Sequence, residues 1–171
     1  MRQREANNDI KPAIPYVFLF DDGGGQTING SYITWDTTKV LTHHFLYTSD
    51  TDRVFLTTNS AGLYEIKFEI SLSGSGVNYF EIYKNGSIVN GSRVYVCSFI
   101  DGQDYYYMSG VLSFTLYLER NDYIQIKGVN VAGTGETIAD CSRLFVKFLP
   151  MQGWDNGTSA GRTQYTGEVM R

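Results

Sequence analysis

The clearest pattern along the chain is an alternation of apolar and polar side chains between Leu63 and Ser73. One face of this run carries only apolar residues, namely Tyr64, Ile66, Phe68, Ile70 and Leu72. The opposite face carries Glu65, Lys67, Glu69 and Ser71. Because successive side chains of a strand point to opposite sides, this period of two predicts a β-strand with one buried face.

Similar runs, rich in β-branched and aromatic residues, recur along the chain and predict further strands. Their ranges are 16–20, 31–35, 40–47, 53–57, 77–83, 87–99, 109–118, 122–131 and 143–149. These runs predict about ten strands and no helix. Apolar residues again share one face of the run near residue 112, which carries Leu112, Phe114, Leu116 and Leu118. Two antiparallel sheets packed on such faces form a sandwich or jelly roll, and we expect this all-β fold.

The turns between these runs support a chain of hairpins. Asn85-Gly86 separates two β-rich runs, and both residue types readily adopt the positive φ that a two-residue hairpin requires. A break of a different kind follows the first run, where Asp21 and Asp22 precede three glycines. We therefore expect a hairpin at Asn85-Gly86 and an irregular loop after residue 20.

Length and composition fit a single domain with polar ends. The chain has 171 residues, of which 42% are hydrophobic, and its 18 Gly, 13 Tyr and 10 Phe favour strands joined by tight turns. Two prolines mark residues 1–15 as an N-terminal arm, whereas residues 16–150 carry the strand pattern of the jelly-roll domain. Residues 151–171 are poor in apolar side chains and are expected to form a C-terminal tail.

Charge and cysteine content narrow the classes of partner. The net charge of −4 and the scattered Lys and Arg argue against binding to nucleic acid. No apolar run is long enough for a membrane helix, and the first twenty residues lack the apolar core of a signal peptide. The chain is then either made in the cytoplasm or a processed form. Cys97 and Cys141 are far apart and form either one disulfide or two buried thiols.

Side chains suited to catalysis or metal binding are few. His43 and His44 are neighbours within a predicted strand, so their rings should lie on opposite faces and should not hold one metal together. The Gly-Thr-Gly at 133–135 lacks the following helix of a phosphate-binding loop. Three aspartate pairs could offer oxygen ligands to calcium, namely Asp21 and Asp22, Asp50 and Asp52, and Asp101 and Asp104. None of the pairs has the spacing of a defined calcium loop, and roles in turns are favoured. We expect no enzyme, no cofactor and no metal site.

Several fragments resemble the globular head of the complement subcomponent q and tumour necrosis factor superfamily. The run Gly62-x-Tyr64-x-Ile66-x-Phe68 is similar to the family's Gly-x-Tyr-x-Phe-x-aromatic strand. The run Leu118-x-x-Asn121-Asp122-x-Ile124 is similar to its Leu-x-x-Gly-Asp-x-Val, and Ser142 to Leu149 to its last strand. Order and spacing agree over about residues 30–150.

The resemblance implies a ten-stranded jelly roll that assembles as a tight trimer and is displayed on a stalk or surface to bind another molecule. Departures from the family pattern are Ile66 for the central Phe, Asn121 for the Gly of the Gly-Asp pair and Val146 for a glycine in the last strand. No collagen-like repeat precedes the head in this sequence. Since one fold supports many functions, the resemblance identifies no ligand.

The densest aromatic cluster lies where the resemblance places the approach to a strand near the trimer axis. Tyrosine suits interfaces because it is large, fairly rigid and able to satisfy its hydroxyl group. We expect the interface to include Tyr105, Tyr106, Tyr107, Met108 and Tyr117. Ordinary packing and a platform for stacking a glycan or receptor are the alternatives. Glycan-acceptor sequences, each with a following Gly that favours a turn instead, occur at Asn29, Asn85, Asn90 and Asn156.

Together these features predict a non-enzymatic display protein, a homotrimeric jelly-roll component of a virus particle such as a capsid decoration, vertex or head-fibre protein. The polar ends have too few apolar side chains to offset the entropy of ordering, so we expect other capsid or surface proteins to bind them. The expected anchors are Ile10 and Ile14 in the arm and Trp154, Tyr165 and Val169 in the tail. The alternative is an extracellular ligand or adhesin whose head binds a receptor or glycan.

Overall fold

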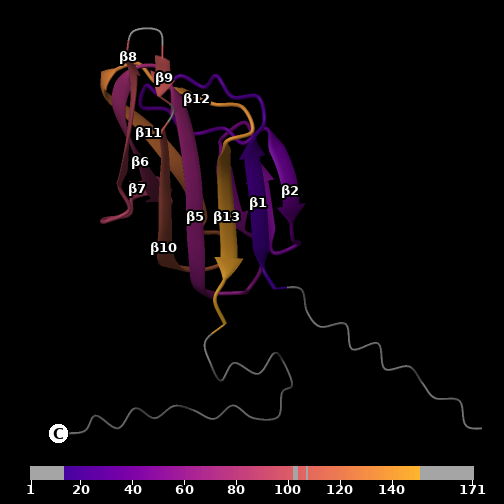
Figure 1. The fold of residues 1–171 in the computed structure, drawn as a ribbon. Coiled ribbons are helices and arrows are strands. Elements are labelled where there is room, and N and C mark those ends of the chain that lie inside the picture. The colour runs from indigo at the N-terminus through magenta and orange to yellow at the C-terminus, as the bar shows by residue number, and fades with distance from the viewer. Residues whose placement is uncertain (1–13, 102–103, 107, 151–171) are drawn as a thin grey trace, which may run out of the picture. The chain divides into compact units, whose positions relative to one another are not determined.

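Residues 14–101, 104–106 and 108–150 are described in a computed structural model, and these residues form strands and turns without any helix (Figure 1). No helix able to cross a membrane is therefore found among them. The strands are β1 Tyr16–Asp21, β2 Thr37–Leu41, β3 Phe45–Thr48, β4 Arg53–Leu56, β5 Gly62–Ser73, β6 Gly76–Lys84, β7 Ser87–Ile88, β8 Val94–Asp101, β9 Asp104–Tyr106, β10 Met108–Leu118, β11 Tyr123–Gly133, β12 Glu136–Thr137 and β13 Ser142–Phe148.

The strands form two antiparallel sheets packed face to face. The first sheet has the order β10-β5-β13-β1-β2, with β12 also paired to β5, and it faces the viewer in Figure 1. The second has the order β3-β4-β11-β6-β8-β9, with β7 paired to β6. The chain crosses repeatedly between the sheets, and the first strand pairs with the last, as β1 does with β13. This arrangement confirms the predicted two-sheet sandwich and is jelly-roll-like.

The core lies between the sheets and follows the alternation seen in the sequence. The apolar face of β5 is completely buried, as are Leu144 and Val146 on the neighbouring β13. The second sheet contributes Phe80 and Ile82 from β6 and Ile124 and Ile126 from β11, also fully buried. Because both sheets present every second side chain inward, the remaining side chains of each strand form the two outer faces of the sandwich.

The hairpin at Asn85-Gly86 is confirmed. Asn85 has φ 51° and Gly86 has φ 78°, and they join β6 to β7 in the two-residue loop that the sequence predicts. The Asn85 side chain donates a hydrogen bond to Asp122 Oδ1 at 2.6 Å and accepts one from the Tyr123 backbone at 3.0 Å. The hairpin is thereby tied to the start of β11.

Some predicted strands are wrong in their extent. Residues 31–35 form a loop with one bridge, from Tyr32 to Lys127, and only Ile33 and Trp35 of this loop are buried in the core. The run 40–47 is divided between β2 and β3, which belong to different sheets, and 87–99 between β7 and β8. Strands β9 and β12 were not predicted, since each is only two or three residues long.

Candidate interaction surface

The outer face of the first sheet carries an unusual concentration of aromatic rings. Val17, Leu19 and Asp21 of β1 are buried, so the intervening side chains of the strand point outward. Phe145 joins them from β13, opposite Phe18 in the register. We call these four residues the aromatic face: Tyr16, Phe18, Phe20 and Phe145.

The rings of the aromatic face pack on one another. Phe18 and Phe145 are stacked, with ring centroids 4.1 Å apart and an interplanar angle of 16°. Phe20 lies 4.4 Å from Phe18, and Tyr16 lies 6.5 Å from Phe145. All four rings remain only half-buried, although they belong to a sheet whose other side already forms the core. The outer side of this sheet is therefore apolar where a solvated sheet would be polar.

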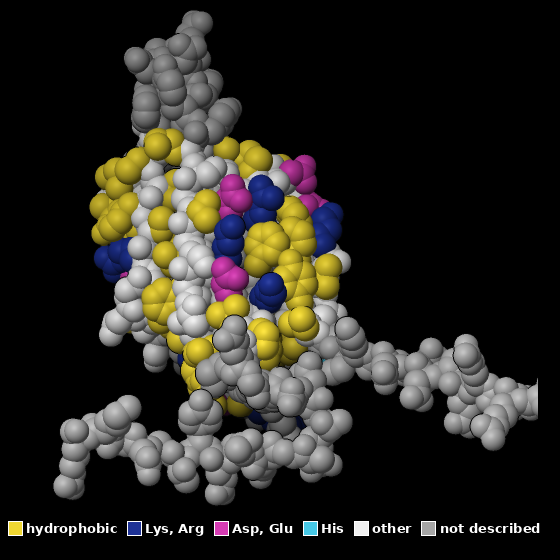
Figure 2. All heavy atoms as spheres, turned by 60° about the horizontal axis from the view of Figure 1, so that its bottom comes forward, with side chains coloured by type: hydrophobic (Ala, Val, Ile, Leu, Met, Phe, Trp, Pro, Cys, Tyr) yellow, Lys and Arg dark blue, Asp and Glu magenta, His cyan; other side chains and the backbone are white. Residues whose placement is uncertain are grey.

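Charged side chains follow the aromatic face along β5 and β13. Arg143 Nε lies 2.9 Å from Glu69 Oε2, and Ser113 Oγ donates a hydrogen bond to Glu65 Oε1 at 2.8 Å. Lys67 and Lys147 have no carboxylate within 4.0 Å among the residues that the structure describes. In Figure 2, hydrophobic side chains of this region lie beside interspersed Lys or Arg and Asp or Glu side chains.

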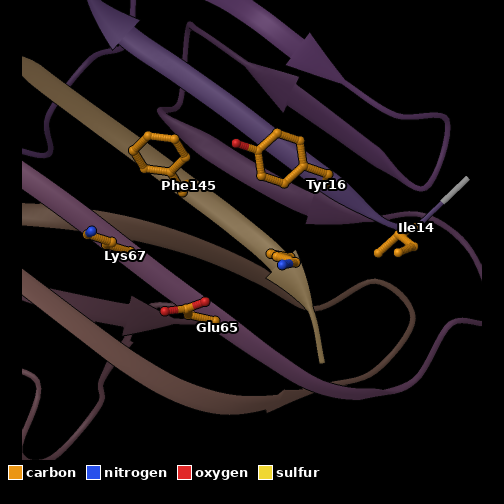
Figure 3. Close-up of a pocket in the computed structure, with 6 residues that line it drawn as sticks. Ile14, Tyr16, Glu65, Lys67 and Phe145 are labelled. Carbon is orange, nitrogen blue, oxygen red and sulfur yellow. The ribbon is translucent and has the colours of Figure 1, made fainter. Parts of the chain in front are cut away.

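A shallow groove of about 510 Å³ runs over the same face (Figure 3). Its apolar side is formed by Ile14, Tyr16 and Phe145, and its charged side by Glu65, Lys67 and Lys147. Ile14 is 52% exposed. A groove with one apolar side and one charged side suits binding to another protein surface.

Exposed hydrophobic side chains also occur at both edge strands of the first sheet. Val40 and Leu41 on β2 are 40% and 37% exposed, and Val111 on β10 is 50% exposed. The predicted interface residue Tyr117 is 49% exposed and lies on the outer face of β10, beside Leu63. The sheet thus has one apolar patch over β1 and β13, while β10 carries two separate exposed apolar side chains, Val111 and Tyr117, with Ser113 and Thr115 between them.

The structure does not bring the predicted interface cluster to one place. Met108, 43% exposed, begins β10 and Tyr117 nearly ends it, which separates them by about 30 Å along the strand. Tyr105 and Tyr106 belong to β9 in the other sheet, and Tyr107 lies outside the described residues. The expected anchors Ile10, Trp154, Tyr165 and Val169 also lie outside them. A role for any of these residues stays a prediction.

Sequence reasoning missed the aromatic face, although a signal for it was present. Every position from Tyr16 to Phe20 is apolar, so alternation must direct half of these side chains away from the core. A continuous apolar strand indicates that both of its faces are covered. The run was interpreted only as a strand.

Two of the three aspartate pairs lie at bends or turns, Asp21 and Asp22 at the end of β1 and Asp50 and Asp52 between β3 and β4. A turn role for Asp101 and Asp104 stays a prediction. Asp36 accepts hydrogen bonds at 2.7 Å from the backbones of Asp22 and Gly23, and Asp21 accepts one at 2.9 Å from Gly24. The hydrogen bond from Thr37 lowers the pKa of the Asp22 carboxyl, and nearby Lys39 lowers it further. No group of three or more His, Cys, Asp or Glu that could hold a metal occurs among the described residues.

The predicted placement of the two histidine rings on opposite faces of a strand is wrong. His43 and His44 lie in the turn before β3, and their ring centroids are 3.9 Å apart with the rings tilted by 35°. His44 is 9% exposed, and burial, followed by the charge of His43, lowers its pKa.

Cys97 and Cys141 are free thiols. The structure therefore favours free thiols over a disulfide, but the expected burial is wrong, because Cys97 is exposed and Cys141 is only partly buried.

Comparison with models of known protein families finds no match to this chain, and comparison with curated proteins finds none either.

Proposed function

We propose that the protein is a non-enzymatic structural protein whose jelly roll assembles as a homotrimer and is displayed on the surface of a virus particle, as a decoration, vertex or head-fibre protein. The observation that carries the proposal is the aromatic face. Aromatic side chains dominate the energetics of protein interfaces, and an exposed patch of stacked rings in a monomer would be an aggregation hazard. The resemblance to trimeric jelly rolls supports the same assembly.

Cyclic assembly also needs a second surface on each subunit. A closed ring of three subunits joins two different surfaces of each subunit, and these must be complementary. The aromatic face supplies one, and we propose the outer side of β10, where Val111 and Tyr117 are exposed, as the other. Acidic and basic side chains lie between these two surfaces and can form ion pairs across such an interface. The acidic residues are Glu65 and Glu69, and the basic residues are Lys67, Lys147 and Arg143.

Light scattering of the full chain at micromolar concentration tests the assembly. We expect three times the mass of one chain. Phe145→Glu places a charge in the centre of the aromatic face and should yield monomers that still melt cooperatively. The matched control Tyr95→Glu places the same charge on the other sheet, at a position 56% exposed, and should leave the trimer intact. A monomeric wild-type chain would refute the trimer.

The setting on a particle is tested separately, by whether the protein co-purifies with virus particles. We propose that other particle proteins bind the terminal segments, through Ile10 and Ile14 in the arm and Trp154, Tyr165 and Val169 in the tail. Absence from purified particles would refute this setting while leaving the trimer untouched.

A second candidate function is that of an extracellular ligand or adhesin that binds a receptor or glycan through its head. The observation that favours it is the outer face of the second sheet. Tyrosine rings and cations, rather than the stacked apolar rings of the first sheet, gather there.

A further inference from the structure

The outer face of the second sheet carries tyrosines interleaved with charges. Asn78, Phe80 and Ile82 of β6 are buried, so the intervening side chains of that strand point outward. The register places Lys127 of β11 opposite Glu81, and Tyr95 of β8 opposite Tyr79. We call this set the tyrosine–cation face: Tyr32, Tyr79, Glu81, Tyr83, Arg93, Tyr95 and Lys127.

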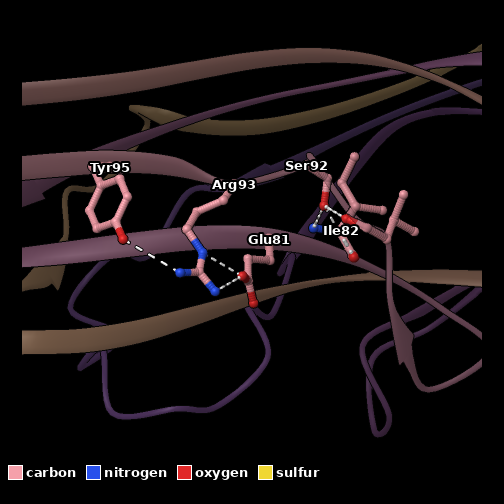
Figure 4. A network of polar contacts seen from close by, with 6 residues as sticks. Glu81, Ile82, Ser92, Arg93 and Tyr95 are labelled. Carbon is pink, nitrogen blue, oxygen red and sulfur yellow. Dashed lines mark hydrogen bonds and ion pairs between the residues drawn. The ribbon is translucent and has the colours of Figure 1, made fainter.

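Arg93 is held rigidly at one side of this face (Figure 4). Its Nε donates a hydrogen bond to Glu81 Oε1 at 2.6 Å, Nη2 contacts the same oxygen, and Nη1 lies 3.4 Å from the Tyr95 hydroxyl. The guanidinium stacks on the Tyr79 ring, 4.1 Å from its centroid. The adjacent Ser92 is fully buried, accepts a hydrogen bond from the Ile82 backbone and donates one to Val89.

This arrangement leaves Arg93 with unused donors. Of the guanidinium N–H groups, one on each terminal nitrogen has no partner among the described residues. The side chain is 42% exposed, whereas that of Glu81 is only 3% exposed. Because the Arg93 side chain is partly exposed, solvent screens the ion pair and its contribution to stability is modest. The contacts of Arg93 with Glu81, Tyr79 and Tyr95 hold the guanidinium in one orientation, which lowers the entropy cost of binding a ligand there.

Lys127 supplies a second cation on the other side of β6. Its ammonium lies 5.4 Å from the ring centroid of Tyr83 and 5.8 Å from that of Tyr32. No carboxylate lies within 4.0 Å of it among the described residues, even though Glu81 is its partner in the register. Because β11 and β8 flank β6, the backbones that carry the two cations are about 10 Å apart.

We propose that the tyrosine–cation face binds a saccharide that bears a carboxylate group. The apolar side of a sugar ring would stack on Tyr95, which is 56% exposed, while sugar hydroxyls pair with the phenol groups and the free N–H groups of Arg93. The carboxylate pairs with Lys127, the cation of this face that has no carboxylate partner among the described residues. Since Glu81 pairs with Arg93, Lys127 carries the one positive charge of the face that no carboxylate neutralises among the described residues, and this favours an anionic group on the ligand.

A saccharide fits better than an acidic peptide. The backbones of β11, β6 and β8 pair with one another, so a peptide cannot add a strand at this face and only side chains are available for recognition. Phenol rings with hydroxyl tips match a ligand that has an apolar ring face and a margin of hydroxyl groups. The proposal deepens the second candidate function, and it does not depend on the trimer because all seven residues belong to one subunit.

Amide NMR titration of the full chain with sialyllactose tests the proposal, with lactose as the neutral control. We expect sialyllactose to shift amides of residues 79–83, 93–97 and 125–129, and lactose to bind more weakly. Lys127→Met should weaken binding of sialyllactose at least about tenfold, because a charge-assisted contact is lost. Tyr95→Ala should weaken both sugars, since it removes the stacking ring from an exposed position.

The matched control is Lys39→Met, which removes a lysine that also lies over a ring, 5.4 Å from Phe20, but on the first sheet. It should leave the affinity unchanged. The proposal is overturned if sialyllactose shifts no amide of the tyrosine–cation face, or if Lys39→Met weakens binding as much as Lys127→Met. Binding of an oligoglutamate peptide to this face without binding of the sugar would assign the site to an acidic protein instead. Light scattering on the same samples reports the trimer separately.

Discussion

At the scale of single residues, Phe68 shows how one position of β5 is tied to the core. Its ring is fully buried, and its neighbours in the register are Leu112 on β10 and Leu144 on β13. Phe68→Ala should lower the free energy of unfolding by about 3–5 kcal/mol, because the burial of a ring is lost and a cavity remains. Denaturant melts measure the change.

The control for Phe68 is the next residue, on the opposite side of the sheet. Glu69 forms an ion pair with Arg143 on the outer face, and a partly exposed ion pair of this kind contributes about 1 kcal/mol or less. Glu69→Ala should therefore cost far less than Phe68→Ala. Equal losses in the two melts would contradict the assignment of the core face.

His44 should make folding sensitive to mild acid. Burial, followed by the charge of His43, lowers its pKa in the folded state below the ordinary value of 6.5, and its Nδ1 is buried without a hydrogen-bond partner among the described residues. The unfolded chain then binds the proton more readily, so this contribution is fully present above pH 6.5 and is lost as the pH falls toward the folded pKa. Chemical denaturation at pH 7 and pH 5 should show lower stability at pH 5.

Two variants separate the causes of this pH dependence. His44→Phe removes the titrating ring and should flatten the difference between pH 7 and pH 5. His43→Gln removes only the charge of the neighbouring ring and leaves the burial of His44 in place. A smaller difference in stability between pH 7 and pH 5 should therefore persist. An unchanged difference in His44→Phe would assign the acid sensitivity to other groups.

At the scale of elements, the sequence predicted strands well where one face is buried and the other solvated. The bounds of β5 follow directly from its alternation. The prediction of one strand at 40–47 was wrong because its first residues belong to one sheet and its last residues to the other. Nothing in the composition marks the crossing between the sheets at Thr42 to His44. The predicted strand at 31–35 was wrong for a similar reason. Ile33 and Trp35 are buried in the core from a loop, and such a loop is as apolar as a strand.

Gly110 of β10 illustrates a contact that sequence alone cannot supply. A Cβ at this position would lie 2.3 Å from Val96 Cγ2 and 3.5 Å from Val94 Cγ2 of β8, in the opposite sheet. The glycine therefore permits the two sheets to close at this edge. Gly110→Ala should lower the free energy of unfolding by about 1–3 kcal/mol through overpacking.

A double-mutant cycle distinguishes this clash from a general weakness of the strand. Val96→Ala removes the methyl group that the new Cβ would meet, so Gly110→Ala should cost less in that background than in the wild type. Additive losses in denaturant melts would show that the close approach of β10 and β8 is not the cause.

At the scale of the whole molecule, the two outer faces of the sandwich differ in chemistry. The first sheet presents stacked apolar rings with exposed hydrophobics at both edges, which suits a permanent contact with a copy of the same chain. The second presents tyrosines around the Arg93 guanidinium and the Lys127 ammonium, which suits a polar ligand. In the proposed trimer the first face is covered and the second remains available.

The terminal segments provide the last prediction, because their composition contrasts with that of the domain. Residues 1–15 and 151–171 carry few apolar side chains, and ordering a backbone costs about 1–2 kcal/mol per residue. A chain of residues 16–150 retains all thirteen strands and the whole aromatic face. It should therefore fold and form trimers in light scattering.

The same truncated chain should fail to join virus particles, whereas the full chain should co-sediment with them. Removal of residues 1–15 alone and of residues 151–171 alone shows which segment carries the contact. Ile14, the proposed anchor within the described residues, lines the groove beside Tyr16. An adhesin would behave differently, since its head would still bind sialyllactose after truncation and the termini would be dispensable. Retained incorporation of residues 16–150 into particles would refute the anchoring role, because binding to the particle would then have to reside in the jelly roll itself.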